Sequence, residues 1–101
     1  MFNRNSLNES FSANLVDAVW QKGQVVAGYD AAIWRKDACN AWMKRSEYGN
    51  TNSDNGWEID HILPKEKGGK DDLSNLQPLQ WENNRHKSDN YPNWTCKVKA
   101  A

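Results

Sequence analysis

Residues 57–89 place the strongest constraint on how this chain can fold. From Trp57 to Asp60 apolar and polar side chains alternate, which is the period of a half-buried strand, and Pro64 ends that strand because proline cannot donate to a strand pair. A second proline, Pro78, marks an edge strand further on. The segment is therefore expected to form a strand (57–63), a charged loop (65–72), a short edge strand (76–79) and a helix (81–89). This order is a ββα unit, and it favours a small single domain of the α+β class.

The residues before this unit give weaker signals. The apolar residues between Phe11 and Trp20 are spaced as on one face of a short amphipathic helix. Residues 31–48 fit either two short strands joined by a turn near Asn40 or one helix, and residues 50–56 form a loop. The chain divides into a polar N-terminal arm (1–10), an N-terminal scaffold of short helix and strand elements (11–55), the ββα motif (56–90) and a C-terminal tail that packs on the domain (91–101).

Composition limits the core and its cross-links. A chain of 101 residues makes one domain, and its six tryptophans are expected to supply most of a thin core. Cys39 and Cys96 stand alone and form no Cys-x-x-Cys pair, so no structural zinc site is expected. Two separate thiols are the expected state of these cysteines, and a Cys39–Cys96 disulfide is the alternative.

Charge and hydropathy bear on the partner and the cellular setting. Thirteen basic and thirteen acidic residues give no net charge, so no global field attracts nucleic acid. The charge is divided unevenly, with −2 over residues 1–60 and +2 over residues 61–101. No apolar run has the length of a membrane span, and the N-terminus lacks the apolar core of a signal peptide. A cytoplasmic protein without a membrane partner is therefore expected.

Asp60 and His61 stand side by side near the end of the first expected strand. An aspartate oxygen is a ligand for a hard cation, and a histidine can take a proton from water near neutral pH. Neighbouring side chains on a strand point to opposite faces, so the chain must be distorted here if both residues serve one site. Asn84 on the expected helix offers a neutral oxygen, and together with Asp60 it would bind one Mg²⁺ or Mn²⁺ ion. Asn83 is the alternative ligand, because the helix register is defined only to within a residue.

Asn75 and several basic residues surround this pair. The Asn75 amide can donate and accept at once, so we expect it to tie the loop 65–72 to the strand that carries His61. An ordinary turn asparagine would make nearly the same contacts. The basic residues nearest the pair are candidates to bind a phosphate backbone without reading base sequence: Lys65, Lys67, Lys70, Arg85 and Lys87.

The joint spacing of four blocks resembles the HNH nuclease family, whose ββα-metal motif places Asp-His, then Asn, then His or Asn on the helix. The blocks are Trp57-Glu58-Ile59-Asp60-His61-Ile62-Leu63-Pro64, Gly68-Gly69, Asp72-Leu73-Ser74-Asn75-Leu76-Gln77-Pro78-Leu79 and Asn84-Arg85-His86-Lys87. Together they extend over about a third of the chain. The third position is Asn84, so the chain resembles a small stand-alone HNN variant, and it lacks the zinc cysteines of many members. His86 would face away from Asn84 on a helix.

The resemblance implies an endonuclease of DNA, with RNA as an alternative substrate. His61 would be the general base, Asn75 the residue that orients it, and Asp60 and Asn84 the ligands of a single Mg²⁺-type ion. Such an enzyme hydrolyses phosphodiester bonds by in-line attack of water and leaves 5′-phosphate and 3′-hydroxyl ends. The resemblance fits a monomer or a weak homodimer equally well.

Two other interpretations fit the same residues. A nucleic-acid-binding or accessory module would keep the fold and cut weakly or not at all, which zero net charge and the HNN pattern favour. A small interaction protein would use Asp60 and His61 only as a metal-stabilised structural site. Cleavage of DNA and binding of a divalent metal distinguish the three.

Overall fold

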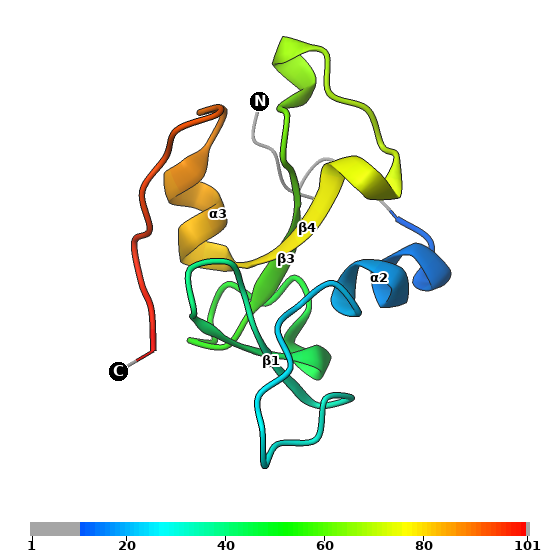
Figure 1. Cartoon of the computed structure of the whole chain (residues 1–101), viewed down its shortest axis with the longest axis vertical. Helices are drawn as coiled ribbons and strands as arrows, with labels where there is room; N and C mark the ends of the chain where they lie inside the picture. The colour runs from blue at the N-terminus through cyan, green and yellow to red at the C-terminus, as the bar shows by residue number, and fades with distance from the viewer. Residues whose placement is uncertain (1–10, 101) are drawn as a thin grey trace.

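The computed structural model describes residues 11–100 as short elements around one central strand pair (Figure 1). In chain order, with η for a 3₁₀ helix, they are α2 (Ala13–Trp20), β1 (Trp34–Lys36), β2 (Trp42–Lys44), η1 (Arg45–Glu47), β3 (Trp57–His61), η2 (Lys65–Lys67), η3 (Leu73–Asn75), β4 (Leu76–Gln80) and α3 (Trp81–Lys87). The strands pair in two antiparallel sheets, β1 with β2 and β3 with β4. This combination confirms the predicted α+β class. The arm predicted for residues 1–10 lies outside the described residues.

α2 forms because its sequence supplies an N-cap and one apolar face. The Ser12 side chain accepts a hydrogen bond from the Leu15 backbone N–H at 3.1 Å, which satisfies one of the donors left open at a helix start. Val16, Val19 and Trp20 are buried in the core that α2 shares with β3 and β4. The helix predicted within the first third of the chain is confirmed, and it ends at Trp20.

β1 and β2 form a hairpin, which confirms the two-strand interpretation of this region. Its turn contains Asn40 at φ 66°, a left-handed conformation that asparagine tolerates better than most residues. The register places a tryptophan opposite a lysine in both outer pairs, Trp34 with Lys44 and Lys36 with Trp42. Residues of these pairs share one face of the hairpin.

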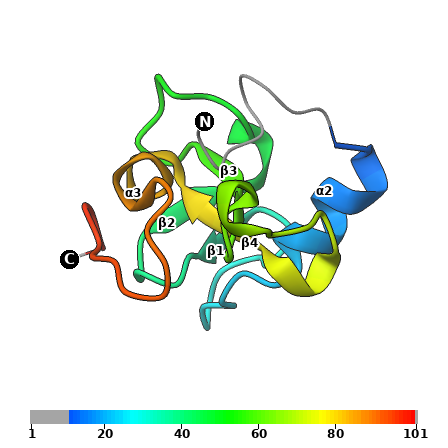
Figure 2. The ribbon, with the colours of Figure 1, turned by 90° about the horizontal axis from the view of Figure 1, so that it is seen from above.

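β3 and β4 pair over five residues, from Trp57 opposite Gln80 to His61 opposite Leu76. Within the described residues β4 pairs with β3 alone, so the edge position predicted from Pro78 is confirmed. The prediction that β3 is half-buried is wrong, because all five of its residues are buried. Figure 2 shows the reason: α2 and α3 lie on opposite sides of the strand pair and cover both of its faces.

α3 follows β4 directly, so β4 determines where the helix begins. The side-chain oxygen of Gln80 accepts hydrogen bonds from the backbone N–H groups of Glu82 and Asn83 at 2.7 and 3.2 Å. The helix ends at Lys87, and Ser88 beyond it has a φ of 52°. The helix predicted for residues 81–89 is therefore confirmed with a slightly earlier end.

The tryptophans contribute less to the core than predicted. Trp20 and Trp57 are buried, with ring centroids 5.1 Å apart, and they pack with the aliphatic residues of α2, β3 and β4. The expectation that most of the six form the core is wrong, since four are only half-buried: Trp34, Trp42, Trp81 and Trp94. Aliphatic side chains fill the space instead, and several indole rings remain in contact with solvent.

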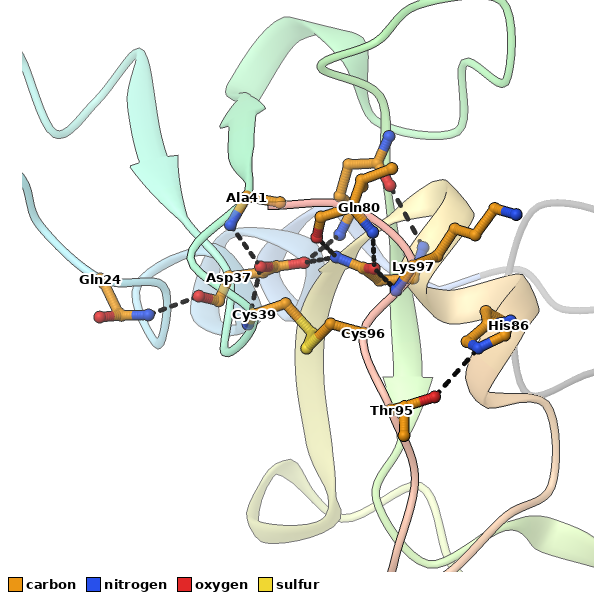
Figure 3. The surroundings of a disulfide bond; sticks show 11 residues. Gln24, Asp37, Cys39, Ala41, Gln80, His86, Thr95, Cys96 and Lys97 are labelled. Atoms are coloured by element: carbon orange, nitrogen blue, oxygen red, sulfur yellow. Dashed lines mark hydrogen bonds between the residues drawn. A yellow bond between two sulfur atoms is a disulfide. The ribbon is translucent and has the colours of Figure 1, made fainter. Parts of the chain in front are cut away.

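A disulfide joins Cys39, in the hairpin turn, to Cys96, in the C-terminal segment, with Cα atoms 5.7 Å apart (Figure 3). The prediction of two separate thiols is therefore wrong. Asn83 Oδ1 of α3 accepts hydrogen bonds from the backbone N–H groups of Lys97 and Val98 at 2.7 and 2.8 Å. The bridge holds the C-terminal segment to the hairpin turn, and the hydrogen bonds hold it against α3.

Two features bear on the predicted location. Disulfides persist in oxidising compartments and are rare in the cytosol, so the Cys39–Cys96 bridge counts against the cytoplasmic setting expected from the sequence. Residues 11–100 contain no helix of the length and apolar character needed to cross a membrane.

We predict that loss of the disulfide lowers the free energy of unfolding by about 2–4 kcal/mol, because a bridge across a sequence separation of 57 residues strongly restricts the unfolded chain. The measurement is urea unfolding of the wild type with and without reductant, and of a Cys39→Ala/Cys96→Ala double variant. The double variant and the reduced wild type should share a midpoint below that of the oxidised protein. Equal midpoints for oxidised and reduced wild type would contradict the prediction.

Candidate active site

β3 presents Asp60 and His61 on opposite faces. The antiparallel register runs without interruption through both residues, with Asp60 opposite Gln77 and His61 opposite Leu76. The predicted distortion is therefore absent, and the two side chains follow the ordinary alternation of a strand. Asp60 faces α3, as does Glu58 two residues earlier, whereas His61 lies on the face turned toward α2.

The Asp60 carboxylate is fully buried and has a partner on each oxygen. Lys87 Nζ lies 3.2 Å from Oδ1, and Gln77 Nε2 donates to Oδ2 at 2.9 Å. Burial raises the pKa of Asp60 to about 6, against the opposing effects of the Lys87 charge and the Gln77 hydrogen bond. Carboxylate oxygens can accept more than one contact each. Asp60 thus presents a fixed carboxylate on the α3 side of the strand.

Lys87 is a buried residue. It is 1 % exposed, and Nζ donates to the His61 backbone carbonyl at 3.1 Å besides its ion pair with Asp60. The prediction that Lys87 binds a nucleic-acid backbone is wrong, because the protein encloses its ammonium group. The sequence did contain a signal, since Lys87 shares a helix face with Asn84 at a spacing of three residues. Lys87 instead clamps the end of β3 to α3.

Glu58 is a second buried carboxylate on the α3 face, and sequence reasoning missed it. Asn84 Nδ2 donates to Oε1 at 2.9 Å, and Arg85 Nη2 forms an ion pair with Oε2 at 2.9 Å. The alternation of β3 could have revealed it, because Glu58 stands two residues before Asp60. Arg85, a predicted phosphate-binding residue, therefore has part of its guanidinium committed to Glu58, with its side chain 30 % exposed.

The two neighbouring asparagines of α3 differ in how many of their side-chain amide atoms are hydrogen-bonded. Asn83 uses its whole amide: Nδ2 donates to Asp37 Oδ2 at 3.0 Å and to the Val98 carbonyl at 2.9 Å, and Oδ1 accepts from Lys97 and Val98. Asn84 Oδ1 is buried and has no hydrogen-bond partner among residues 11–100. A buried oxygen without a partner is uncommon in folded proteins and calls for a ligand. Asn84 is therefore the better candidate of the two to bind a metal.

The His61 ring is fully buried and contacts the loop that follows β3. Its Nε2 lies 2.6 Å from Asp71 Oδ1, and the Phe11 ring lies against it with centroids 6.2 Å apart. The hydrogen bond to His61 lowers the pKa of Asp71, whereas desolvation acts in the opposite direction. Sequence reasoning missed Asp71, because a carboxylate in a charged loop gives no periodic signal. Asp71 is itself largely exposed, with 56 % of its side-chain surface accessible, so it connects the buried ring to solvent.

Asn75 fastens the loop to the end of β3. Its Oδ1 accepts from the Leu63 backbone N–H at 2.8 Å, and Nδ2 donates to the carbonyls of Leu63 and Lys70 at 3.1 and 2.9 Å. Gly69 fits beneath this amide because it has no side chain: a Cβ there would lie 1.7 Å from the Leu63 carbonyl oxygen. Asn75 thus joins both ends of the loop that carries Asp71.

The remaining predicted residues lie on the surface. Lys65, Lys67 and Lys70 are exposed on the loop after β3, and Lys65 Nζ is 3.9 Å from Asp71 Oδ1. His86 is exposed on α3, where Nε2 contacts Thr95 Oγ1 at 3.1 Å (Figure 3). It faces the C-terminal segment, away from β3, as the helical spacing predicts.

The donor set fits a hard metal ion better than a soft one. Residues 11–100 contain no group of three or more His, Cys, Asp or Glu side chains arranged to hold a metal. Asp60 and Asn84 instead offer a carboxylate oxygen and an amide oxygen, the ligands that Mg²⁺ and Mn²⁺ accept while keeping positions for water and phosphate. The unpartnered Asn84 Oδ1 is the observation that supports this fit.

These elements define a ββα domain in which a helix covers the acidic face of an antiparallel strand pair. Residues 46–90, which contain β3, β4 and α3, match the family model of the HNH endonuclease, and this match supports membership of the HNH family for that segment. No curated protein and no solved structure matches the chain.

Asn75→Ala should lower the free energy of unfolding by about 2 kcal/mol, because it removes three hydrogen bonds and leaves the Leu63 backbone groups unpaired. Urea unfolding measures the change. Ser74→Ala is the matched control, since Ser74 is exposed on the same 3₁₀ helix and should shift stability by less than about 0.5 kcal/mol. An Asn75→Ala midpoint equal to that of Ser74→Ala would count against the fastening role.

Lys87→Met should destabilise the metal-free protein by about 3–5 kcal/mol at neutral pH, because it leaves the buried Asp60 carboxylate without its cation. Asp60→Asn/Lys87→Met removes both charges and should recover much of that loss. Chemical denaturation of the wild type, both single variants and the double variant gives the coupling energy. Additive effects of the two substitutions would show that the ion pair contributes nothing.

Proposed function

We propose that this protein is a metal-dependent endonuclease that hydrolyses phosphodiester bonds of DNA. The observation that supports it most is the unpartnered, buried Asn84 Oδ1 on the helix that covers the Asp60 face of β3. Both residues lie in the segment that matches the HNH endonuclease model. A buried amide oxygen without a hydrogen-bond partner is uncommon, and a bound ligand would account for it.

Asp60 and Asn84 would hold one Mg²⁺ or Mn²⁺ ion. When bound, the ion supplies positive charge that stabilises the phosphate oxygens as the bond breaks. Gln77 and Lys87 keep the Asp60 carboxylate in place, and Glu58 does the same for Asn84 by accepting from its Nδ2. The ligands are thus fixed before the ion arrives.

His61 would act as the general base by accepting a proton from the attacking water at a ring nitrogen. Asp71 contacts Nε2, so its carboxylate can orient the ring and stabilise the imidazolium that forms. The ring is buried on the face of β3 opposite Asp60, so the proposal requires the end of β3 to change conformation when DNA binds. The groups that cover the ring, including Phe11 and Asp71, must shift with it. In-line attack then leaves 5′-phosphate and 3′-hydroxyl ends.

The exposed cations beside the site would bind the DNA backbone. Lys65, Lys67 and Lys70 lie on the loop that carries Asp71, and Arg85 lies on α3 with part of its surface accessible. Contacts to phosphate do not depend on base sequence, so the proposal includes no sequence preference, and RNA is an alternative substrate. A monomer or a weak homodimer fits the proposal.

The decisive experiment is plasmid cleavage by the wild type and by His61→Ala, in Mg²⁺, Mn²⁺ or EDTA. We expect metal-dependent nicking or linearisation by the wild type and at least a 100-fold lower rate in His61→Ala, the usual contribution of a general base. End-labelling of the products reports which end carries the phosphate. Wild-type cleavage that continues in EDTA would contradict the role of the metal. Full activity of His61→Ala would contradict the role of His61 as general base.

Asp60→Asn and Asn84→Ala should raise the Mn²⁺ concentration that gives half-maximal cleavage by about 10–100-fold, because each removes one proposed ligand. Calorimetric titration of Mn²⁺ into each protein measures binding independently of turnover. His61→Ala is the control, since it should bind Mn²⁺ as the wild type does. Unchanged Mn²⁺ affinity in both ligand variants would exclude this site.

A second candidate function is a nucleic-acid-binding or accessory module that does not cut. The fully buried His61 ring, held by Asp71, favours it, because a base that stays enclosed cannot reach substrate. Retention of DNA on a gel without cleavage in either metal would support this function over the endonuclease.

A further inference from the structure

The outer face of the β1–β2 hairpin carries a regular array of aromatic and cationic side chains. Trp34 lies opposite Lys44 and Lys36 opposite Trp42, so tryptophans and lysines occupy alternate corners of one face. We name these four residues, together with the neighbouring Tyr29, the aromatic–lysine surface. The opposite face of the hairpin carries Arg35 and Met43, which are buried.

Contacts within the aromatic–lysine surface hold its rings in place. The Trp34 and Trp42 centroids lie 5.8 Å apart, edge to face, and Tyr29 lies 4.7 Å from Trp42. Lys36 Nζ is 4.7 Å from the Trp42 ring and Lys44 Nζ is 5.5 Å from the Trp34 ring. A cleft of about 290 Å³ opens between these rings and Asn55. The rings therefore form a fixed, accessible platform.

The surface remains accessible in the folded chain. Trp34 and Trp42 are half-buried, and Tyr29 is 51 % exposed. An aromatic group that serves only the core would bury more of its area, since burial of the ring is the source of its stabilisation. Both charged residues on this strand face are lysines, which complements an anionic partner.

We propose that the aromatic–lysine surface binds an unpaired segment of nucleic acid, with bases stacked on the rings and backbone phosphates beside Lys36 and Lys44. Every base has a π-face, so stacking on tryptophan and tyrosine tolerates any sequence. Paired bases within a duplex do not expose that face, and the partner is therefore a single strand, a frayed end or a displaced strand. The choice of nucleic acid as the partner rests on the proposed function.

The aromatic–lysine surface is separate from the candidate active site. The hairpin joins the Trp57 end of β3, through the Lys44 N–H to Asn55 carbonyl bond at 3.0 Å and the Trp57 Nε1 to Arg45 carbonyl bond at 3.3 Å. His61 lies at the other end of β3, about 13 Å further along the strand. Figure 1 shows β1 and the loop after β3 at opposite ends of the domain. Binding at the surface can therefore be measured without chemistry at His61.

The test measures binding of a fluorescently labelled 12-nucleotide oligo-dT, and of a duplex of equal length, by anisotropy in EDTA. The wild type should bind the single strand more tightly than the duplex. Trp34→Ala and Trp42→Ala should each weaken single-strand binding by about 5–100-fold, the effect of losing one stacked base. Lys36→Gln/Lys44→Gln should reduce the slope of log affinity against log salt by about 1.4, the value for two lost phosphate contacts.

Controls separate stacking from folding. Tyr91→Ala removes an exposed aromatic ring from the C-terminal segment and should bind oligo-dT as the wild type does. Trp34→Phe and Trp42→Phe keep an aromatic face and should retain most of the affinity, and urea unfolding of every variant identifies those that lose structure. Folded Trp34→Ala and Trp42→Ala proteins with wild-type affinity would overturn the inference.

The outcome also separates this inference from the proposed function. If oligo-dT binding depends on the two tryptophans but the wild type does not cleave plasmid, the binding surface is supported and the endonuclease proposal is rejected. If the wild type cleaves plasmid but single-strand binding does not depend on Trp34 and Trp42, the endonuclease proposal is supported and the binding surface is rejected.

Discussion

The buried carboxylate of Asp37 is the interaction on which the rest of the structure depends. Its Oδ1 accepts hydrogen bonds from the backbone N–H groups of Cys39 and Ala41 at 2.9 and 2.8 Å, which close the β1–β2 turn. Its Oδ2 accepts from the Gln80 N–H at 2.9 Å and from Asn83 Nδ2 at 3.0 Å, at the junction of β4 and α3 (Figure 3). One side chain thus joins the N-terminal scaffold to the start of the helix that covers the site. A buried carboxylate with four donors is stable, whereas loss of those donors would leave a buried charge.

The position of α3 decides what the candidate site contains. Asp37 and Gln80 fix the first turn of the helix, and Asn83 connects that turn to the C-terminal segment. With the first turn fixed, the helical period directs Asn84 and Lys87 toward β3. The Cys39–Cys96 bridge anchors the same C-terminal segment to the hairpin turn. A cross-link remote from the candidate site therefore supports the position of Asn84, the proposed ligand, in a chain without Cys-x-x-Cys pairs.

Local sequence patterns predicted most of the helices and strands. They failed to predict which residues are buried where helices cover both faces of a strand pair. Pro64, Pro78 and the alternation within β3 are enough to predict the strand pair. Each of these signals acts on the local backbone and is therefore visible in the sequence. Alternation also separates Glu58 and Asp60 from Ile59, but it cannot show that a helix covers the polar face. For that reason Glu58 was missed and Lys87 was placed on the surface. Residues that pair across long separations leave no local signal.

The same limit applies to the cysteines, the tryptophans and the loop. The distance between Cys39 and Cys96 is set by tertiary packing, and spacing alone could not distinguish a bridge from two thiols. Indole rings are amphipathic, so composition could not tell Trp57 in the core from Trp34 on the hairpin face. The contact of Asp71 with His61 depends on the shape of a loop that Asn75 and Gly69 determine together.

Charge balance on the α3 face explains how two carboxylates can be buried beside each other. Arg85 neutralises Glu58 and Lys87 neutralises Asp60, so the metal-free face carries paired charges and no excess. A divalent ion at Asp60 and Asn84 would add two positive charges to this balanced face. Such an ion would have to compete with Lys87 for Asp60, which would limit its affinity, and the net positive charge would attract a phosphate. In this arrangement the paired cations stabilise the metal-free protein, and excess positive charge would arise only if the proposed ion were bound.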